Sequence, residues 1–375
     1  MPFTGRAQND ACSLRISLLT CAPGEELYST FGHTALRVKD EHAGTDEVFN
    51  YGTFEFSPDF NIKFIRGKLL YSLSVEDFAD FMYAYRVESR SVQEQVLQLG
   101  CAEKQQLYLA LQRNALPQDR DYRYDFLFDN CTTRAGDMVA RNTQAPVQFA
   151  NILPSKTPTF RDLIHSYLDA GHEHWSKLGI DLLLGAPLDR KVSNREAMFL
   201  PDYLLKGFDH ATVGGHRLAD PPQTILQMPS PLTENSFITP AVAFTALLVL
   251  ILALSMVRSK GGRTALMIFD FIFFLVVGLA GLLLLFMWFG TDHQVCRNNY
   301  NLVWALPTNA VMAFFVHSKK QWPARYFRVV ALLNAVLLLA WVLLPQKLNP
   351  ALIPLILLLI HRSWSLSKLP AHARA

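Results

Sequence analysis

Hydrophobic and polar residues are distributed differently in the two parts of this 375-residue chain. Up to about residue 235, short apolar runs alternate with polar turns, which is typical of a globular domain that mixes strands and helices. From about residue 238, long apolar runs dominate, and such runs indicate helices that cross a membrane. We therefore expect an α+β domain over residues 1–145, an extension and linker at the membrane surface over residues 146–235, and an all-α transmembrane domain of about five helices over residues 236–375.

The first part of the chain contains several predicted strands, which are separated by turns rich in Gly, Pro and polar residues. We expect strands over residues 14–20, 33–38, 48–56, 64–73 and 122–128, and an extended segment over residues 90–97. Helices are expected over residues 74–86, 102–114, 133–141 and 160–168. These strands would form a small antiparallel sheet, with the helices partly segregated from it.

Five apolar segments follow a linker that is marked by Pro221, Pro222, Pro229 and Pro231. They cover residues 238–257, 265–288, 302–316, 326–344 and 348–364. The first, second and fourth approach or exceed the ~20 residues that a helix needs to cross a bilayer. The third and fifth are shorter, and each contains a proline.

Lys and Arg residues flank the apolar segments in a way that predicts their orientation. They gather between the first and second segments, between the third and fourth, and beyond the fifth. All three places fall on one side, the cytoplasmic side, if all five segments span a bacterial inner membrane. The N-terminal domain then lies in the periplasm. Residues 1–11 are polar and lack the apolar core of a signal peptide, so we expect a mature or re-engineered N-terminus.

The composition and the charge of the chain exclude some classes of function. The net charge is only +3, and the basic residues form no stripe that would indicate a nucleic-acid partner. The five cysteines show no pairing of the kind that binds a metal. We expect neither a metal nor a cofactor. Their odd number leaves at least one thiol unpaired or shared between chains. A Cys12–Cys21 and a Cys21–Cys101 disulfide both remain open.

The segment from Asp129 to Arg134 (DNCTTR) carries the strongest candidate chemistry. It lies between an aromatic, strand-like run and a predicted helix, and either Asn130 or Asp129 is suited to cap that helix. Cys131 would then lie at a helix N-terminus, where the partial positive charge favours the thiolate. The alternative, a buried structural cysteine, is equally compatible with the spacing.

A cysteine nucleophile needs a base, and His33 is the best candidate. It lies in the segment FGHTALRV, whose alternation places His33, Ala35 and Arg37 on one face of a strand. Hairpin pairing with the next strand would bring Asn50 close enough to orient the imidazole ring. A hydrogen bond at the end of a turn explains Asn50 equally well.

Three further polar features have an open interpretation. His172 and His174 lie on a turn, and a solvated turn explains them better than a metal site does. The loop over residues 291–301 is dense in hydrogen-bonding groups, and it suits either ligand binding or a polar membrane interface. Asp270 lies inside the second apolar segment, where a functional role and a helix-packing role are both open.

The order of the candidate residues resembles that of known enzyme families. A histidine on a strand that precedes a cysteine opening a helix resembles the permuted papain-like (NlpC/P60-like) enzymes, and Asn130-Cys131 resembles the Asn-Cys motif of lecithin:retinol-acyltransferase-like enzymes. The chain looks most like the Lnb family of lipoprotein N-acyltransferases. The matching segments are residues 18–24, 31–38, 50–54, 124–126, 129–134, 291–293 and 301–304.

This resemblance implies a permuted papain-like periplasmic domain and an acyltransferase activity. The acyl donor would be a phospholipid, and the acceptor would be the N-terminal amine of a diacylated lipoprotein. Cys131 would be the nucleophile, His33 the base and Asn50 a third catalytic residue. The residues expected to bind substrate are Asn130, Arg134, Tyr51, Arg37, His293 and Asn301. Two rival classes remain, namely a cell-wall cysteine peptidase, amidase or phospholipase, and a non-catalytic membrane sensor.

Overall fold

The computed structural model describes residues 12–368 apart from residues 27, 55–57, 230–236 and 319. The chain forms two compact units, the first of Met1–Phe64, Lys68–Pro158 and Val192–Thr233 and the second of Ile65–Gly67, Thr159–Lys191 and Glu234–Ala375. The expected extension over residues 146–235 is thus divided between the two units. Residues 1–11, residues 55–56 of an expected strand and the linker residue Pro231 lie outside the described part.

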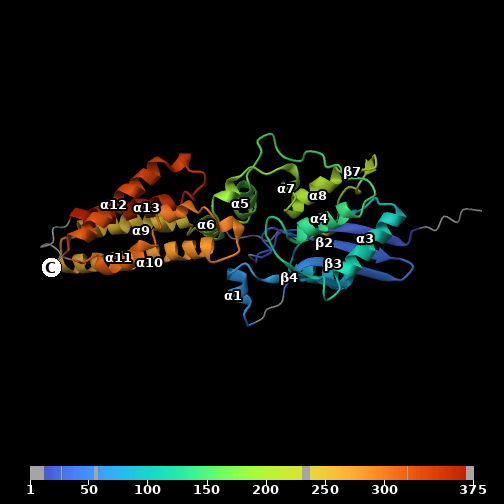
Figure 1. Cartoon of the computed structure of the whole chain (residues 1–375), viewed down its shortest axis with the longest axis horizontal. Coiled ribbons are helices and arrows are strands. Elements are labelled where there is room, and N and C mark those ends of the chain that lie inside the picture. The colour runs from blue at the N-terminus through green and yellow to red at the C-terminus, as the bar shows by residue number, and fades with distance from the viewer. Residues whose placement is uncertain (1–11, 27, 55–57, 230–236, 319, 369–375) are drawn as a thin grey trace, which may run out of the picture. The chain divides into compact units, whose positions relative to one another are not determined.

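The first unit is built on an antiparallel sheet (Figure 1). In the described part of the chain, seven strands pair in the order β6-β4-β3-β2-β1-β5-β9. Their bounds are β1 (Leu14–Cys21), β2 (His33–Asp40), β3 (Thr45–Thr53), β4 (Leu70–Asp77), β5 (Val92–Val96), β6 (Asp121–Arg123) and β9 (Gln223–Leu226). A separate two-stranded ladder joins β7 (Thr212–Val213) and β8 (His216–Arg217).

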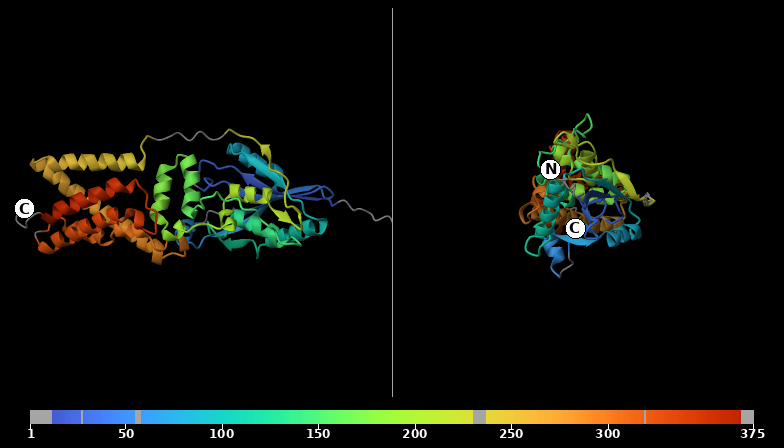
Figure 2. Two further views of the ribbon diagram at one scale, coloured as in Figure 1. Left: turned by 90° about the horizontal axis from the view of Figure 1, so that it is seen from above. Right: turned by 90° about the vertical axis from the view of Figure 1, so that its right-hand side faces the viewer.

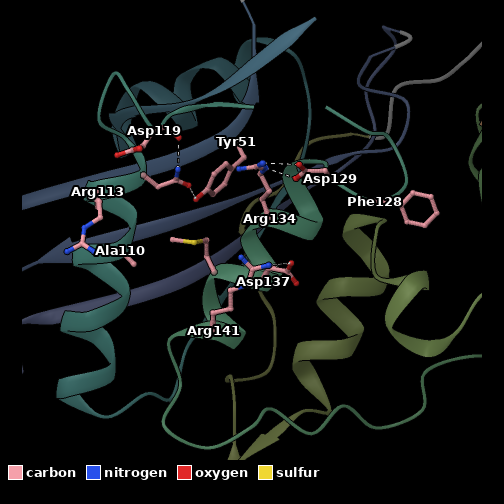
Figure 3. Close-up of a pocket in the computed structure, with 11 residues that line it drawn as sticks. Tyr51, Ala110, Arg113, Asp119, Phe128, Asp129, Arg134, Asp137 and Arg141 are labelled. Atoms are coloured by element: carbon pink, nitrogen blue, oxygen red, sulfur yellow. Dashed lines mark hydrogen bonds and ion pairs between the residues drawn. The ribbon is translucent and has the colours of Figure 1, made fainter. Parts of the chain in front are cut away.

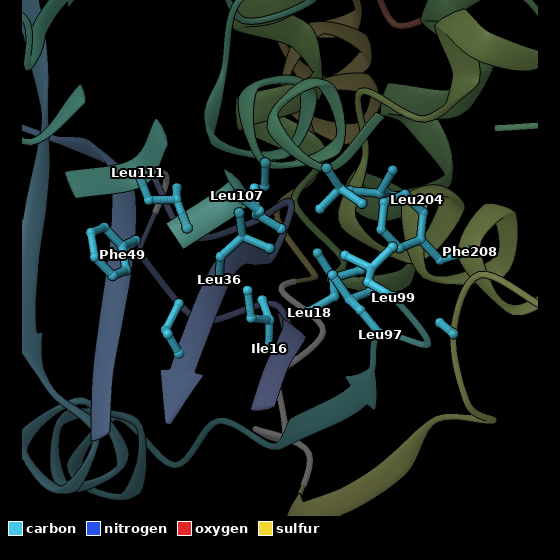
Figure 4. Close-up of a cluster of buried hydrophobic side chains, with 14 of the residues drawn as sticks. Ile16, Leu18, Leu36, Phe49, Leu97, Leu99, Leu107, Leu111, Leu204 and Phe208 are labelled. Carbon is cyan, nitrogen blue, oxygen red and sulfur yellow. The ribbon is translucent and has the colours of Figure 1, made fainter. Parts of the chain in front are cut away.

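One face of the sheet is covered by α3 (Cys101–Asn114), α4 (Cys131–Arg141) and α8 (Pro201–Asp209). Figure 4 shows buried side chains of this layer, which come from the strands, from the segment between β5 and α3, and from α3 and α8. The labelled members are Ile16, Leu18, Leu36, Phe49, Leu97, Leu99, Leu107, Leu111, Leu204 and Phe208. Each such side chain contributes roughly 1.5–3 kcal/mol through burial, so this layer holds α4 firmly against β2 and β3.

The other face is covered by α2 (Phe78–Val87). Phe81 and Tyr85 of this helix pack on Leu19, Ala35 and Val48 of the sheet. Because side chains alternate along a strand, β2 and β3 contribute to both layers. The sheet is therefore buried on both faces. The polar residues with candidate chemical roles are found toward the ends of its strands.

Three expected elements differ from the observed ones. Residues 64–73 were expected as one strand, but α1 (Phe60–Ile65) precedes β4 there. The strand β4 runs on to Asp77, so the following helix begins later than predicted. The expected strand over residues 122–128 stops at Arg123, because the side chain of Asp125 accepts hydrogen bonds from the N–H groups of Leu127 and Phe128 and turns the chain.

The second unit contains the apolar helices α9 (Pro240–Met256), α10 (Lys260–Phe289), α12 (Gln321–Leu339) and α13 (Leu352–Lys368). By length and composition, α10 and α12 are able to cross a membrane, whereas α9 is shorter. Helices α12 and α13 pack side by side (Figure 2). The third expected segment is not one helix, because it is divided into a 3-10 turn, α11 (Thr308–Met312) and a second 3-10 turn.

Helices α5 (Phe160–Ala170) and α6 (His174–Leu183) belong to this second unit. Arg161 is fully buried and bonds to Asp181 at 2.6 Å and to Asp189 at 3.0 Å. Asn349 also donates to Asp181, at 2.9 Å. A buried charge is stable only when it is paired and hydrogen-bonded, so this network fixes α5 and α6 to the chain beside the apolar helices.

Candidate active site

Cys131 is the first residue of α4, two residues before the expected start of this helix, and so lies at a helix N-terminus as the sequence predicted. The cap is Asn130 rather than Asp129, because its Oδ1 accepts from the N–H of Thr133 at 2.8 Å. The Thr133 hydroxyl in turn accepts from the N–H of Asn130 at 2.8 Å, which completes a capping box. Cys131 is thereby held at the positive end of the helix dipole.

His33 is the first residue of β2 and is hydrogen-bonded to the Cys131 side chain. Gly52, near the end of β3, lies next to both residues of this pair. A Cβ atom placed on Gly52 would lie 3.4 Å from Cβ of Cys131 and 4.0 Å from Cε1 of His33. Its φ of +89°, at a register shift of the ladder between β3 and β4, is a conformation that favours glycine.

The imidazole of His33 also contacts Asn50 of β3, as hairpin pairing predicted. Nε2 of His33 lies 2.5 Å from Oδ1 of Asn50. The Asn50 amide is oriented by Glu76, which accepts from its Nδ2 at 3.0 Å. Because Oδ1 can only accept, Nε2 of His33 carries the proton, and the other ring nitrogen is left for Cys131.

Electrostatics favour an ion pair between the two side chains. Burial alone would raise the pKa of Cys131, but His33, the backbone N–H of Thr34 and the Thr132 hydroxyl together lower the pKa to about 7. Burial would lower the pKa of His33, but the adjacent Cys131 and the hydrogen bonds to Cys131 and Asn50 raise it. This pair can therefore exchange a proton near neutral pH.

Aromatic side chains pack in pairs, most of them in the segments that flank His33 and Cys131. Tyr71 and Tyr124 stack with their ring centroids 4.2 Å apart, and Phe31 and Phe126 lie 4.9 Å apart. Burial and the nearby Cys131 raise the pKa of Tyr124 well above its usual value. Cys131 itself is only 9% exposed, so little bulk water reaches the thiol.

Three of the residues expected to bind substrate are engaged with other protein groups. Arg37 pairs with Asp46 at 2.6 Å and with Glu94 at 3.0 Å. The hydroxyl of Tyr51 donates to Asn114 at 2.6 Å. Asn130 donates both amide hydrogens to backbone carbonyls, those of Phe126 and Phe199.

Arg134 makes a bidentate pair with Asp129, at 2.6 and 2.8 Å. Arg134, Asp129 and Tyr51 line an open hollow of about 710 Å³ between α3 and α4 (Figure 3). Neither Cys131 nor His33 is among the residues that line it. The hollow thus does not include the thiol. Arg134, which lines the hollow, also lies over the ring of Tyr122.

The remaining two candidates lie in the second unit. His293 packs against Gly67, where an added Cβ would lie 3.3 Å from the imidazole ring. Asn301 is fully buried; its amide donates to the carbonyl of Asp181 at 2.8 Å and accepts from the Trp304 indole at 2.9 Å. We therefore assign Asn301 a structural contact rather than a substrate contact. In the described residues, no group of three or more His, Cys, Asp or Glu side chains is arranged to hold a metal ion.

The cysteine pairing also differs from both expected alternatives. The disulfide joins Cys12 and Cys101, whereas Cys21, Cys131 and Cys296 are free and buried. Burial raises the pKa of the Cys21 thiol to about 12. A structural disulfide is typical of an oxidising compartment such as the periplasm.

Sequence reasoning missed three groups at this site, namely Glu76, the N–H of Thr34 and Tyr122. Thr34 follows His33 directly, so the motif contained this residue. The motif did not indicate that the backbone N–H of Thr34 bonds to Cys131. Glu76 reaches Asn50 only because β3 and β4 pair in a register that sets Val48 opposite Glu76.

Two family models match the chain. The model of the Lnb N-terminal periplasmic domain matches residues 4–166, and that of the Lnb transmembrane domain matches residues 232–372. The chain belongs to the Lnb family. Searches of curated proteins and of solved structures returned no match.

Membership in the Lnb family agrees with the resemblance seen in the sequence motifs. It makes the protein a membrane protein with a periplasmic N-terminal domain. The Lnb domains also suggest an enzyme of the lipoprotein N-acyltransferase type. In the structure, the described N-terminal unit is the sheet-rich part and the apolar helices form the C-terminal part.

Proposed function

We propose that this Lnb protein moves an acyl chain from a phospholipid to the N-terminal cysteine amine of a diacylated lipoprotein. The observation that carries the proposal is the Cys131–His33–Asn50 arrangement at the N-terminus of α4. A thiol with a pKa near 7 beside an oriented imidazole is suited to nucleophilic catalysis.

In the first half-reaction, the Cys131 thiolate attacks the ester carbonyl of the phospholipid. A C–S bond forms and the carbonyl oxygen becomes an oxyanion. The intermediate then collapses, the ester C–O bond breaks, and protonated His33 gives its proton to the departing lysophospholipid oxygen. The product is a thioester on Cys131.

In the second half-reaction, the α-amine of the lipoprotein attacks the thioester carbonyl. Neutral His33 takes a proton from the amine as the C–N bond forms. The C–S bond then breaks, which releases the amide and restores the Cys131 thiolate beside protonated His33. All protons are accounted for by these two residues, and the lipoprotein becomes triacylated.

The chain order of the site supports a permuted papain-like domain. His33 and Asn50 lie on adjacent antiparallel strands and precede Cys131 on its helix. The permuted papain-like enzymes place the base before the nucleophile in the same way. The orientation of the imidazole by an amide oxygen is the geometry that such a cysteine–histidine pair requires.

The membrane part supports a lipid substrate. We propose five spans in the bacterial inner membrane, with the basic flanks in the cytoplasm and the first unit in the periplasm. Donor and acceptor both carry acyl chains in that bilayer, so a membrane-anchored site raises the frequency with which they meet. The burial of Cys131 limits access of water to the thioester, which favours aminolysis over hydrolysis.

A transfer assay tests this function directly. The detergent-purified full chain is mixed with a phospholipid and a synthetic diacylated lipopeptide, and the lipopeptide mass is recorded. We expect the mass of a lipopeptide with a free N-terminus to increase by one acyl chain. The mass should not increase for an N-acetylated control peptide or with the Cys131→Ala enzyme.

Three other outcomes would favour the rival functions. Release of fatty acid without any lipopeptide product would indicate a phospholipase. Cleavage of a cell-wall peptide in place of acyl transfer would indicate a peptidase or amidase. Equal cellular function of Cys131→Ala and the wild type would indicate a sensor.

A further inference from the structure

The hydroxyl of Tyr122 is a buried polar group without a visible purpose in the fold. Tyr122 lies in β6 and is 6% exposed. Among the residues that the structure describes, no group is hydrogen-bonded to its Oη. Buried polar groups are almost always paired, so an unpaired one calls for an explanation.

This hydroxyl lies beside the candidate nucleophile. A Cβ atom on Gly52 would lie 3.9 Å from Oη of Tyr122 and 3.4 Å from Cβ of Cys131. Gly52 has no such atom, so Tyr122, Cys131 and His33 all border one position from which a side chain is absent. The Tyr122 hydroxyl and Cβ of Cys131 therefore both lie within 4 Å of the same point.

We propose that Tyr122 donates its hydroxyl hydrogen to the oxyanion that forms when Cys131 attacks an acyl carbonyl. This role rests on the acyl-transfer function proposed above. The backbone N–H of Cys131, at the first position of α4, would be the second donor. The side chain of Asn130 is the obvious alternative from the sequence, but both of its amide hydrogens are bonded to backbone carbonyls.

The surroundings of Tyr122 suit a donor. The guanidinium of Arg134 lies 3.5 Å from the centroid of the Tyr122 ring. Arg134 is itself fixed by its bidentate pair with Asp129, so the ring is held in place, and the cation favours negative charge at the phenol oxygen and at a group bonded to it. Burial raises the pKa of Tyr122, so the hydroxyl keeps its proton at neutral pH.

The lack of a partner has a catalytic advantage. A donor already bonded to a carbonyl would have to break that bond when the substrate oxygen arrives. Within the described residues, the Tyr122 hydroxyl has no hydrogen bond to break. The whole free energy of its new hydrogen bond therefore stabilises the oxyanion. The same donor serves the tetrahedral intermediates of both half-reactions, since both form on the carbon attached to Cys131.

The test uses Tyr122→Phe in the full chain, which keeps the ring beneath Arg134 and removes only the hydroxyl. We expect the single-turnover rate of Cys131 acylation to fall about 10²–10³-fold, as for loss of one oxyanion-hole donor, with little change in KM. The rate of Cys131 alkylation by iodoacetamide should not change, because His33 and Thr34 set the thiolate and alkylation forms no oxyanion. Tyr108→Phe is the matched control, since the Tyr108 hydroxyl bonds to Glu47 at 3.0 Å, and it should acylate at the wild-type rate.

A second measurement covers the case in which acylation is too slow to follow. A lipid trifluoromethyl ketone adds to Cys131 to give a stable alkoxide, whereas the matching ether lipid cannot. Tyr122→Phe should weaken binding of the ketone about 10²-fold and leave binding of the ether lipid unchanged.

Three results overturn the assignment. Acylation within about threefold of wild type would show that the hydroxyl is not used. Equal losses of acylation and of alkylation would show that Tyr122 supports the thiolate or the local fold instead. An equal loss of affinity for the ketone and for the ether lipid would show that Tyr122 contacts the substrate in its ground state. If the wild type itself forms no acyl-enzyme, the result contradicts the proposed acyl-transfer function and not the role of Tyr122 alone.

Discussion

Nε2 of His33 lies 2.5 Å from Oδ1 of Asn50, and Nδ2 of the same amide donates to Glu76 at 3.0 Å. The carboxylate can only accept, so it fixes which end of the amide faces the imidazole. Two residues on the neighbouring strands β3 and β4, Asn50 and Glu76, therefore determine the tautomer of His33 and its orientation toward Cys131. This relationship makes Asn50 and Glu76 positioning residues for the proposed base.

Asn50→Ala should lower kcat by about 10²-fold, because a catalytic group displaced by ~1 Å loses about that factor. KM for the phospholipid should change little, since Asn50 contacts the imidazole and not the lipid. Glu76→Gln should have a smaller effect in the same direction, because the amide of Gln can still accept from Asn50. Steady-state kinetics of acyl transfer measure both effects, and a rise in KM with kcat unchanged would contradict a positioning role.

The pH dependence of Cys131 alkylation reports its ionisation. The pKa of Cys131 is lowered to about 7, so the alkylation rate should rise with pH and reach half its maximum near pH 7. His33→Ala removes the main group that lowers this pKa and leaves burial, which raises it. The midpoint should then move above the usual thiol value of about 8.5. A midpoint that does not move would show that His33 does not lower the pKa of Cys131.

The proposed acyl-transfer rate should show two limbs with pH. It rises through about pH 7 as Cys131 becomes a thiolate. It falls at higher pH as His33 loses the proton that the departing lysophospholipid needs, and the raised pKa of His33 moves this fall above the usual value near 6.5. The two limbs belong to the coupled pair. A rate that only falls across the range would contradict this assignment.

The parts of the site that the sequence predicted depend on local signals. Asn130 and Asp129 are both typical caps, so the motif predicted a helix N-terminus at Cys131 without deciding which residue caps it. Alternation and hairpin logic placed Asn50 near His33. The parts that it missed depend on pairing between distant segments. Glu76 is the example, because half of its strand β4 was itself predicted as helix.

The substrate residues were harder to predict for a different physical reason. The motif DNCTTR mixes residues for chemistry with residues for structure, and both kinds are polar. Asn130 and Thr133 form the capping box of α4, and Arg134 pairs with Asp129. Four of the five polar neighbours of Cys131 in this motif therefore serve the fold. In the second unit, Asn301 is buried in a network with Asp181 that no local pattern reveals.

The Cys12–Cys101 disulfide should stabilise the first unit. It closes a loop with a sequence separation of 89 residues, and loss of such a bond costs about 2–5 kcal/mol. Replacing both cysteines with serine should lower the midpoint of chemical unfolding accordingly. A reductant should lower the wild-type midpoint and leave that of the double variant unchanged. Titration of five free thiols in the unreduced wild type would contradict the bond.

Glycines of α10 should determine the packing of the apolar helices. A Cβ on Gly281 would fall inside the contact distance of the Ala305 carbonyl, and one on Gly278 would meet the backbone of Ala310. Close approach at small residues is a common way for membrane helices to pack. Gly281→Ala should therefore cost about 1–3 kcal/mol and lower the melting temperature in detergent. Gly261→Ala on the same helix is the control, because nothing lies within 4 Å of the added atom. Equal melting temperatures for the two variants would contradict this packing.

The central claim is that Cys131 carries the acyl chain, and the intact mass of the protein tests it most directly. The detergent-purified chain is incubated with phospholipid alone and its mass is recorded for wild type, Cys131→Ala and Cys21→Ala, the last being a buried thiol with a raised pKa. The account predicts one acyl-sized adduct on wild type and on Cys21→Ala, none on Cys131→Ala, and its disappearance when a diacylated lipopeptide with a free amine is added. An adduct that persists in Cys131→Ala, or the absence of any adduct on the wild type while acyl transfer proceeds, would contradict it.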